Sequence, residues 1–220
     1  DVSVSGNFAI VGALDEGDLN SGKASRKGAA YIYERKASGD WLEAQKLVAA
    51  DRQNDDFFGN AVVITDNYAF VGAKGQDHDA YGGGYLSQAG AVYVFKRQGN
   101  SWLQVQKLVA SDREASASFG EVLDFSDNNL IIGAPLESKD GSKGTIEYSG
   151  AAYIFQLKST GKWEETQKIM STKRMPGVKF GSAVTISGNH MAIGARLERN
   201  QSKKASENVS TGAIYFYTKD

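Results

Sequence analysis

Short runs of apolar and aromatic residues alternate along this chain with clusters of Gly, Asp, Asn and Ser. Such runs are rich in Val, Ile, Tyr and Phe and are bounded by turn residues, which is typical of β-strands. Runs such as FAIVGA and LIIGA are apolar at consecutive positions, so both faces of these strands must be covered. No segment has the apolar spacing of a convincing helix. The pattern therefore predicts an all-β protein made of small sheets that cover one another.

The runs recur with a fixed period. Gly-Ala pairs at 12–13, 72–73, 133–134 and 194–195 are 60, 61 and 61 residues apart. Each unit predicts four strands, because a second Gly-Ala pair opens a third run, a tryptophan opens a fourth, and a Phe-Gly pair precedes the next unit. These further markers are Gly-Ala at 28–29, 90–91, 150–151 and 212–213, Trp41, Trp102 and Trp163, and Phe-Gly at 58–59, 119–120 and 180–181. Their strict periodicity favours a packing role for the tryptophans.

Four-stranded antiparallel meanders repeated in this way are the blades of a β-propeller. We predict one propeller domain with blades at about 1–50, 59–110, 120–171 and 181–220. The last blade is expected to lack its outer strand, because no Trp-containing run follows its third strand. A closed four-bladed ring, a piece of a larger propeller and half of an eight-bladed ring built from two chains all fit this pattern. An open arc would expose apolar blade faces, which predicts self-association into a closed propeller.

As a set, the Phe-Gly pairs, the Gly-Ala pairs and the GAxYxF and W…QK runs resemble FG-GAP repeats across the whole chain. This family builds the seven-bladed propeller of integrin α-subunits and of many bacterial secreted proteins. The resemblance is closest to the bacterial branch with a short turn after the first strand. It implies a non-catalytic recognition or adhesion module, secreted or at the cell surface. Integrin-type units carry a calcium loop at this turn, but TDNY, SDNN, SGNF and SGNH are too short to wrap calcium, so those sites are not expected here.

The connections between second and third strands are long and differ among the repeats. They span 14–27, 74–89, 135–149 and 196–211 and are expected to share one rim. Long variable loops on a rigid scaffold often carry binding, although solvated loops without a ligand are the alternative. Their carboxylates and tyrosines suit recognition of sugar hydroxyls or of peptides. The candidate ligand-binding residues are Asp15, Asp18, Asp77, His78, Asp79, Tyr81, Tyr85, Glu137, Asp140 and Tyr148, with Glu16 and Asn20 beside them.

Two rival functions use other chemistry. A carbohydrate-binding lectin would use the Tyr and Asp residues of these loops. A propeller glycoside hydrolase would need paired carboxylates on the inner strands, where Glu121 and Asp124 have only neutral counterparts in the other units. Asp77 and Asp79 could hold a calcium ion, but a two-carboxylate motif is a weak signal. We therefore expect no catalytic residue, no metal and no cofactor.

The composition of the chain limits the classes of partner that it is expected to bind. The chain has 25 Lys and Arg against 26 Asp and Glu and no long basic run, which disfavours nucleic acid. Cysteine is absent, so disulfides and thiolate metal sites are excluded. The only histidines, His78 and His190, are far apart in sequence, which argues against a His-based triad or a zinc site. No apolar run reaches the length of a membrane span, so no membrane insertion is expected. The expected partner is a protein or a glycan.

Overall fold

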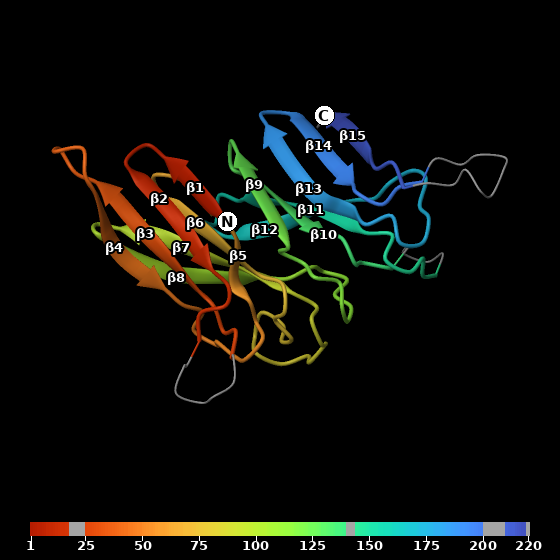
Figure 1. Cartoon of the computed structure of the whole chain (residues 1–220), viewed down its shortest axis with the longest axis horizontal. Helices are drawn as coiled ribbons and strands as arrows, with labels where there is room; N and C mark the ends of the chain where they lie inside the picture. Colours follow the sequence, from red (N-terminus) through yellow and green to blue (C-terminus); the bar gives the residue numbers. More distant parts are fainter. Residues whose placement is uncertain (18–24, 140–143, 200–209, 219–220) are drawn as a thin grey trace.

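The computed structural model describes residues 1–17, 25–139, 144–199 and 210–218, and it confirms the predicted β-propeller architecture (Figure 1). In these residues fifteen strands form four antiparallel sheets, and in each sheet the strands follow one another in chain order. The described residues contain no helix, and so none that could cross a membrane. Each sheet is one blade, because strands of consecutive sheets pack against each other.

Among the described strands, each of the first three blades has four and the last blade has three. The first blade contains β1 (Val2–Ser5), β2 (Phe8–Ala13), β3 (Ala29–Arg35) and β4 (Trp41–Leu47). The second contains β5 (Phe58–Ile64), β6 (Tyr68–Ala73), β7 (Ala91–Gln98) and β8 (Ser101–Leu108). The third contains β9 (Val122–Ser126), β10 (Asn129–Ala134), β11 (Ala151–Leu157) and β12 (Trp163–Ile169). The last contains β13 (Phe180–Ser187), β14 (His190–Ala195) and β15 (Ala213–Thr218), so it has three strands, as the sequence predicts.

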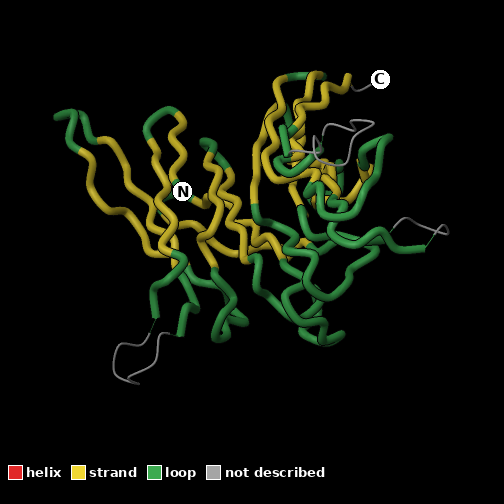
Figure 2. The backbone as a smooth tube through the Cα atoms, turned by 45° about the vertical axis from the view of Figure 1, so that its right-hand side comes forward, coloured by secondary structure: helices red, strands yellow, loops and turns green. Residues whose placement is uncertain are grey.

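The two ends of the blades carry different connections. Figure 2 shows short turns at one end of the first two blades and the long connections at the other. This arrangement follows from the meander, in which successive connections alternate between the two ends of a sheet. The long connections therefore form a common rim, which we call the loop rim.

Each Phe-Gly pair lies in the seam between its own blade and the blade before it. Phe58 is fully buried and forms a parallel backbone bridge with Gly28 of the first blade. Its ring packs edge-on against Tyr93, with ring centroids 5.5 Å apart. Gly59 adopts a φ of +91°, and a Cβ there would lie 2.3 Å from the carbonyl oxygen of Ala29. Only glycine fits this position, and the two later Phe-Gly pairs repeat the same backbone bridge.

In the first three blades, the glycine of the Gly-Ala pair in the second strand faces the following blade. A Cβ on Gly72 would lie 2.3 Å from the carbonyl oxygen of Gly120, and Gly12 and Gly133 have contacts of the same kind. In the last blade, the nearest atom to a Cβ on Gly194 would be the Ala183 side chain at 3.2 Å. Close approach of the next blade is therefore the constraint at the first three of these glycines.

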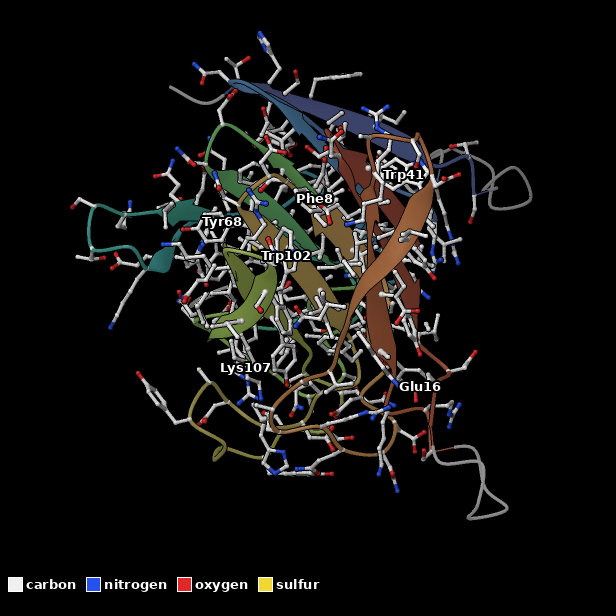
Figure 3. The ribbon with its side chains drawn as sticks, turned by 90° about the vertical axis from the view of Figure 1, so that its left-hand side faces the viewer. Phe8, Glu16, Trp41, Tyr68, Trp102 and Lys107 are labelled. Atoms are coloured by element: carbon white, nitrogen blue, oxygen red, sulfur yellow. The ribbon has the colours of Figure 1, made fainter. Side chains whose placement is uncertain are left out.

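The outer strands of adjacent blades are joined by what we call the Gln-Trp clasp. Gln45 of β4 donates a hydrogen bond to the Trp102 carbonyl and accepts one from the Trp102 amide, both at 2.8 Å. The buried Trp102 ring lies edge-on to Phe8 of the first blade at 5.5 Å (Figure 3). Gln106 and Trp163 repeat the clasp at the next seam. These two tryptophans are packing residues, in agreement with their periodicity.

The first and last blades lie at opposite ends of the molecule, and each leaves one apolar face exposed (Figure 1). Val2 and Val4 are exposed on the first blade, and Ile214 and Phe216 are exposed on the last. Of the arrangements that the sequence left open, the described blades therefore form an open arc.

Candidate functional site

The loop 74–89 is the long connection of the second blade, and its tip is held by a single carboxylate. Asp79 Oδ1 accepts the backbone N–H groups of Tyr81 at 2.8 Å and Gly83 at 3.0 Å. These hydrogen bonds stabilise the ionised carboxylate and lower the pKa of Asp79. The backbone N–H of Asp79 also donates to the Gly83 carbonyl. The tip therefore has a defined backbone, and it presents Tyr81 with 99% of the residue exposed.

The two ends of the same loop are held by Arg113, which lies in the connection from the second blade to the third. Arg113 donates to the carbonyl oxygens of Asp77 and Gly84 at 2.9 and 2.8 Å. Asp77 Oδ1 accepts the backbone N–H of Gln88 at 2.7 Å. The two carboxylates considered for calcium, Asp77 and Asp79, thus each fix the backbone of their own loop. Among the residues that the structure describes, no three His, Asp or Glu side chains are grouped to hold a metal ion.

A second aromatic group lies on the flank of this loop. The rings of His78 and Tyr85 pack edge-on with centroids 5.6 Å apart. His78 is oriented by its backbone N–H, which donates to Gln76 Oε1 at 2.7 Å. Tyr85 is 65% exposed. The loop therefore offers two tyrosines to solvent on a backbone fixed by internal hydrogen bonds.

A groove of about 640 Å³ runs beside Tyr81, between the loop tip and the outer strands β8 and β12. The Asp51–Lys107 ion pair lies in it at 2.7 Å, and the Tyr93 hydroxyl donates to Asp51 at 2.6 Å. Burial alone would raise the pKa of Asp51, but the hydrogen bonds from Lys107 and Tyr93 outweigh it and lower that pKa. Figure 3 places Lys107 where the second blade meets the loop rim. The polar side chains lining the groove are Asp51, Gln104, Gln106, Lys107, Lys162 and Glu164.

Glu137 lies in the equivalent network of the third blade and is not on the surface. It is 1% exposed, and its carboxylate pairs with Lys168 at 2.6 Å and with Arg174 at 3.2 Å. Lys168 also pairs with Asp112, which accepts a hydrogen bond from the Tyr153 hydroxyl. Glu137 is thus engaged inside the protein and is not available to a ligand.

The position of Glu137 within the repeat carries the signal that sequence reasoning missed. The third residue after each second-strand Gly-Ala pair is Glu16, Gln76, Glu137 or Glu198. The backbone N–H of each bonds to the alanine carbonyl of that pair, which begins the long loop in the same way in every blade. Glu16 pairs with Lys46 and Arg52. Regular recurrence of Glu or Gln marks a structural position, in contrast to the variable parts of these loops.

The remaining candidates are dispersed. Asp15 is exposed on the first blade, and Tyr148 is 39% exposed on the third. Among the described interactions, no hydrogen bond or ring contact joins either residue to the loop 74–89. The structure brings Asp77, His78, Asp79, Tyr81 and Tyr85 together, because they share that loop. Three candidates, Asp18, Asn20 and Asp140, lie outside the described residues.

The inner-strand carboxylates considered for hydrolysis have different surroundings. Asp124 Oδ2 accepts hydrogen bonds from the Thr185 hydroxyl at 2.6 Å and the Ile186 backbone N–H at 2.8 Å. It therefore ties the third blade to the last. Glu121 lines a small hollow of about 410 Å³ between the inner strands, together with Asn60 and others.

Comparison with known proteins identifies the repeat. A family model described as FG-GAP repeat matches residues 41–95, 102–155 and 163–217, which is more than half of the chain. Each match begins at the tryptophan of a fourth strand and ends in the third strand of the following blade. No curated protein matches the chain.

Proposed function

Since the chain belongs to the FG-GAP repeat family, we propose that it is a non-catalytic recognition module that binds a protein or glycan partner at its loop rim, outside the cell or at the cell surface. The observation that carries this proposal is Tyr81, which is 99% exposed on a tip that Asp79 holds in one conformation. A tyrosine with no packing role on a fixed backbone has little conformational entropy to lose when a partner covers it. Tyr85 on the same loop enlarges the aromatic surface.

A catalytic role has less support. The hydrolase hypothesis needs two carboxylates on the inner strands at a defined separation around a substrate. Asp124 instead accepts two hydrogen bonds across a blade seam, which fixes it as part of the scaffold.

Carbohydrate binding is the second candidate, and the groove beside Tyr81 favours it. Its lining offers carboxylates, amides and ammonium groups within about 640 Å³, next to an exposed aromatic ring. This combination suits a sugar, whose hydroxyls need hydrogen bonds and whose ring face packs on an aromatic side chain.

Arrays of glycans and of peptides and proteins, probed with the 220-residue chain, test both functions. Tyr81→Ala should weaken binding to any true ligand by about tenfold, which corresponds to about 1.4 kcal/mol. Leu42→Ala is the matched control, because Leu42 is 53% exposed on β4 of another blade. For glycan ligands, Glu164→Ala in the groove should also weaken binding.

Each outcome decides a different point. If no ligand of any class binds, recognition by this chain is refuted. If a ligand binds and Tyr81→Ala, Tyr85→Ala and Leu42→Ala leave its affinity equal, the loop 74–89 is not the site. If a glycan ligand is insensitive to Glu164→Ala while Tyr81→Ala weakens it, the groove is not the sugar site.

A further inference from the structure

In the first and third blades, the glutamate at the start of the long loop pairs with an arginine from the connection to the next blade. Glu16 pairs with Arg52 at 2.8 Å, and Glu137 pairs with Arg174 at 3.2 Å. These two arginines and Arg113 are spaced 61 residues apart, so all three occupy one position of the repeat. At two of the three blade junctions, this arginine is thus bound by a carboxylate of the loop beside it.

The second blade has a neutral residue where the other blades have glutamate. Gln76 is fully buried, and none of the described ion pairs involves Arg113. The guanidinium of Arg113 instead donates through both terminal nitrogens to loop carbonyls, from Nη2 to Asp77 at 2.9 Å and from Nη1 to Gly84 at 2.8 Å. Asp77 and Gly84 flank the tip that carries Tyr81, so one side chain joins the two sides of that tip.

A second position changes together with Gln76. Asp56, which lies just before the Phe-Gly pair, is 2% exposed, and its Oδ2 accepts a hydrogen bond from Gln76 Nε2 at 3.2 Å. A glutamate at 76 has no proton to donate at neutral pH and would face this buried carboxylate with like charge. The equivalent pairs of residues in the two later blades are Ala117 with Glu137 and Val178 with Glu198. An aspartate at the first position therefore accompanies the amide at the second, and an apolar residue accompanies the glutamate.

We propose that Arg113 is the positioning residue of the loop 74–89, and that the neutral side chain of Gln76 assigns it this role. Gln76 does not compete for the guanidinium, because it carries no charge and its amide nitrogen donates to Asp56. Arg113 then holds the two sides of the tip, and Asp79 fixes the backbone within it. Hydrogen bonds from an ionised donor are about twice as strong as neutral ones. The consequence for ligand binding rests on the proposed function, whereas the effect on the loop does not.

Two measurements report the order of the tip without any ligand. They are the rate of chymotrypsin cleavage after Tyr81 and the rate of hydrogen–deuterium exchange at the amides of Tyr81 and Gly83. Arg113→Ala should raise both rates about tenfold, which is the effect of losing one hydrogen bond from a charged donor. Arg35→Ala is the matched control, because Arg35 donates two hydrogen bonds to Asn7 at the opposite end of the first blade. Its rates should equal those of the wild type, and urea unfolding shows whether each variant is folded.

The role of Gln76 is tested by giving the second blade the residues of the third. Asp56→Ala combined with Gln76→Glu places a carboxylate beside Arg113 and removes the like charge that would face it. The guanidinium should then leave the loop carbonyls for this carboxylate, and both rates should rise about tenfold although Arg113 is present. Asp56→Ala alone keeps the neutral Gln76, so its rates at the tip should equal those of the wild type.

The outcomes separate the loop from its ligand. A folded Arg113→Ala protein with wild-type cleavage and exchange at the tip overturns the positioning role. The role of Gln76 is overturned if the double variant keeps wild-type rates, or if Asp56→Ala alone raises them equally. These results hold whether or not the arrays find a ligand, so they are independent of a failure of the proposed function. For a ligand that Tyr81→Ala weakens, Arg113→Ala should weaken binding as well, and an unchanged affinity would refute the consequence for recognition.

Discussion

Replacement of Gly72 by alanine should destabilise the protein through the seam that follows it. The backbone of Gly72 is outside the left-handed region, so alanine itself is compatible with the local conformation. Its Cβ, however, would lie 2.3 Å from the Gly120 carbonyl oxygen, and ordinary contact begins at 3.4 Å. The third blade would have to move away by about 1 Å, because the Gly120 oxygen belongs to the backbone and the new Cβ is attached directly to the backbone of Gly72. Overpacking of this kind costs about 3 kcal/mol of unfolding free energy.

Gly194→Ala is the matched control for this effect. Gly194 occupies the same repeat position in the last blade, where a Cβ would meet only the Ala183 side chain at 3.2 Å and atoms at 3.7 Å or beyond. A small adjustment of Ala183 accommodates it, so the unfolding free energy should change by less than about 0.5 kcal/mol. The two variants differ in whether a later blade lies against the substituted glycine: one does at Gly72, and none is described at Gly194.

Urea unfolding followed by circular dichroism measures the difference. For a domain of this size, 3 kcal/mol also lowers Tm by about 10 °C. A Gly72→Ala protein as stable as the wild type would refute the claim that contact with the next blade dictates glycine here. Equal destabilisation by Gly72→Ala and Gly194→Ala would refute it too, because it would place the cause within the strand.

Two further predictions concern the seams between blades. Burial raises the pKa of Asp56 to about 6 from an unfolded value of 3.8, so the unfolded state binds fewer protons between these pH values and stability falls as pH rises through them. Asp56→Asn should remove this pH dependence of the unfolding free energy, which amounts to at most about 3 kcal/mol. Urea unfolding at pH 4.5 and 7.5 measures it, and a variant that keeps the wild-type pH dependence would contradict the reasoning. Gln106→Met removes both hydrogen bonds to the Trp163 backbone and should lower the unfolding free energy by about 1 to 2 kcal/mol. Gln167 is at the equivalent position of the next blade and has no described Trp partner, so Gln167→Met should lower it by less than about 0.5 kcal/mol. If urea unfolding shows equal losses for the two variants, the clasp is not the cause.

The sequence predicted the scaffold well because each blade seam uses the same few residues. The Phe-Gly and Gly-Ala contacts recur at every described seam, and the tryptophan contact recurs at the first two. Trp102 illustrates this, because its period predicted a packing role and its ring is buried against Phe8. The open arc could not be decided in this way, since a repeat pattern describes one seam and not how many seams close a ring.

The candidate site was harder to predict, because its residues are not distinguished by type. Tyr81 and Tyr148 look alike in sequence, yet only Tyr81 is almost fully exposed on a tip fixed by a neighbouring aspartate. The sequence groups Glu137 with the other loop carboxylates, but its side chain turns inward to Lys168. Asp124 is a carboxylate on an inner strand, as a hydrolase would need, yet it accepts hydrogen bonds from the next blade. These distinctions depend on contacts between blades that are distant in sequence.

The family repeat and the blade are offset by one strand along the chain. Each matched unit begins with the outer strand of one blade and continues through three strands of the next, so every unit spans the crossover between two blades. Duplication of a unit in the gene would add one blade and one seam while leaving the existing seams intact. Loss of a unit would likewise leave the remaining blades joined in register. Blade number can thus change over evolution in single steps, and each step keeps the outer strand of one blade covalently joined to the inner strand of the next.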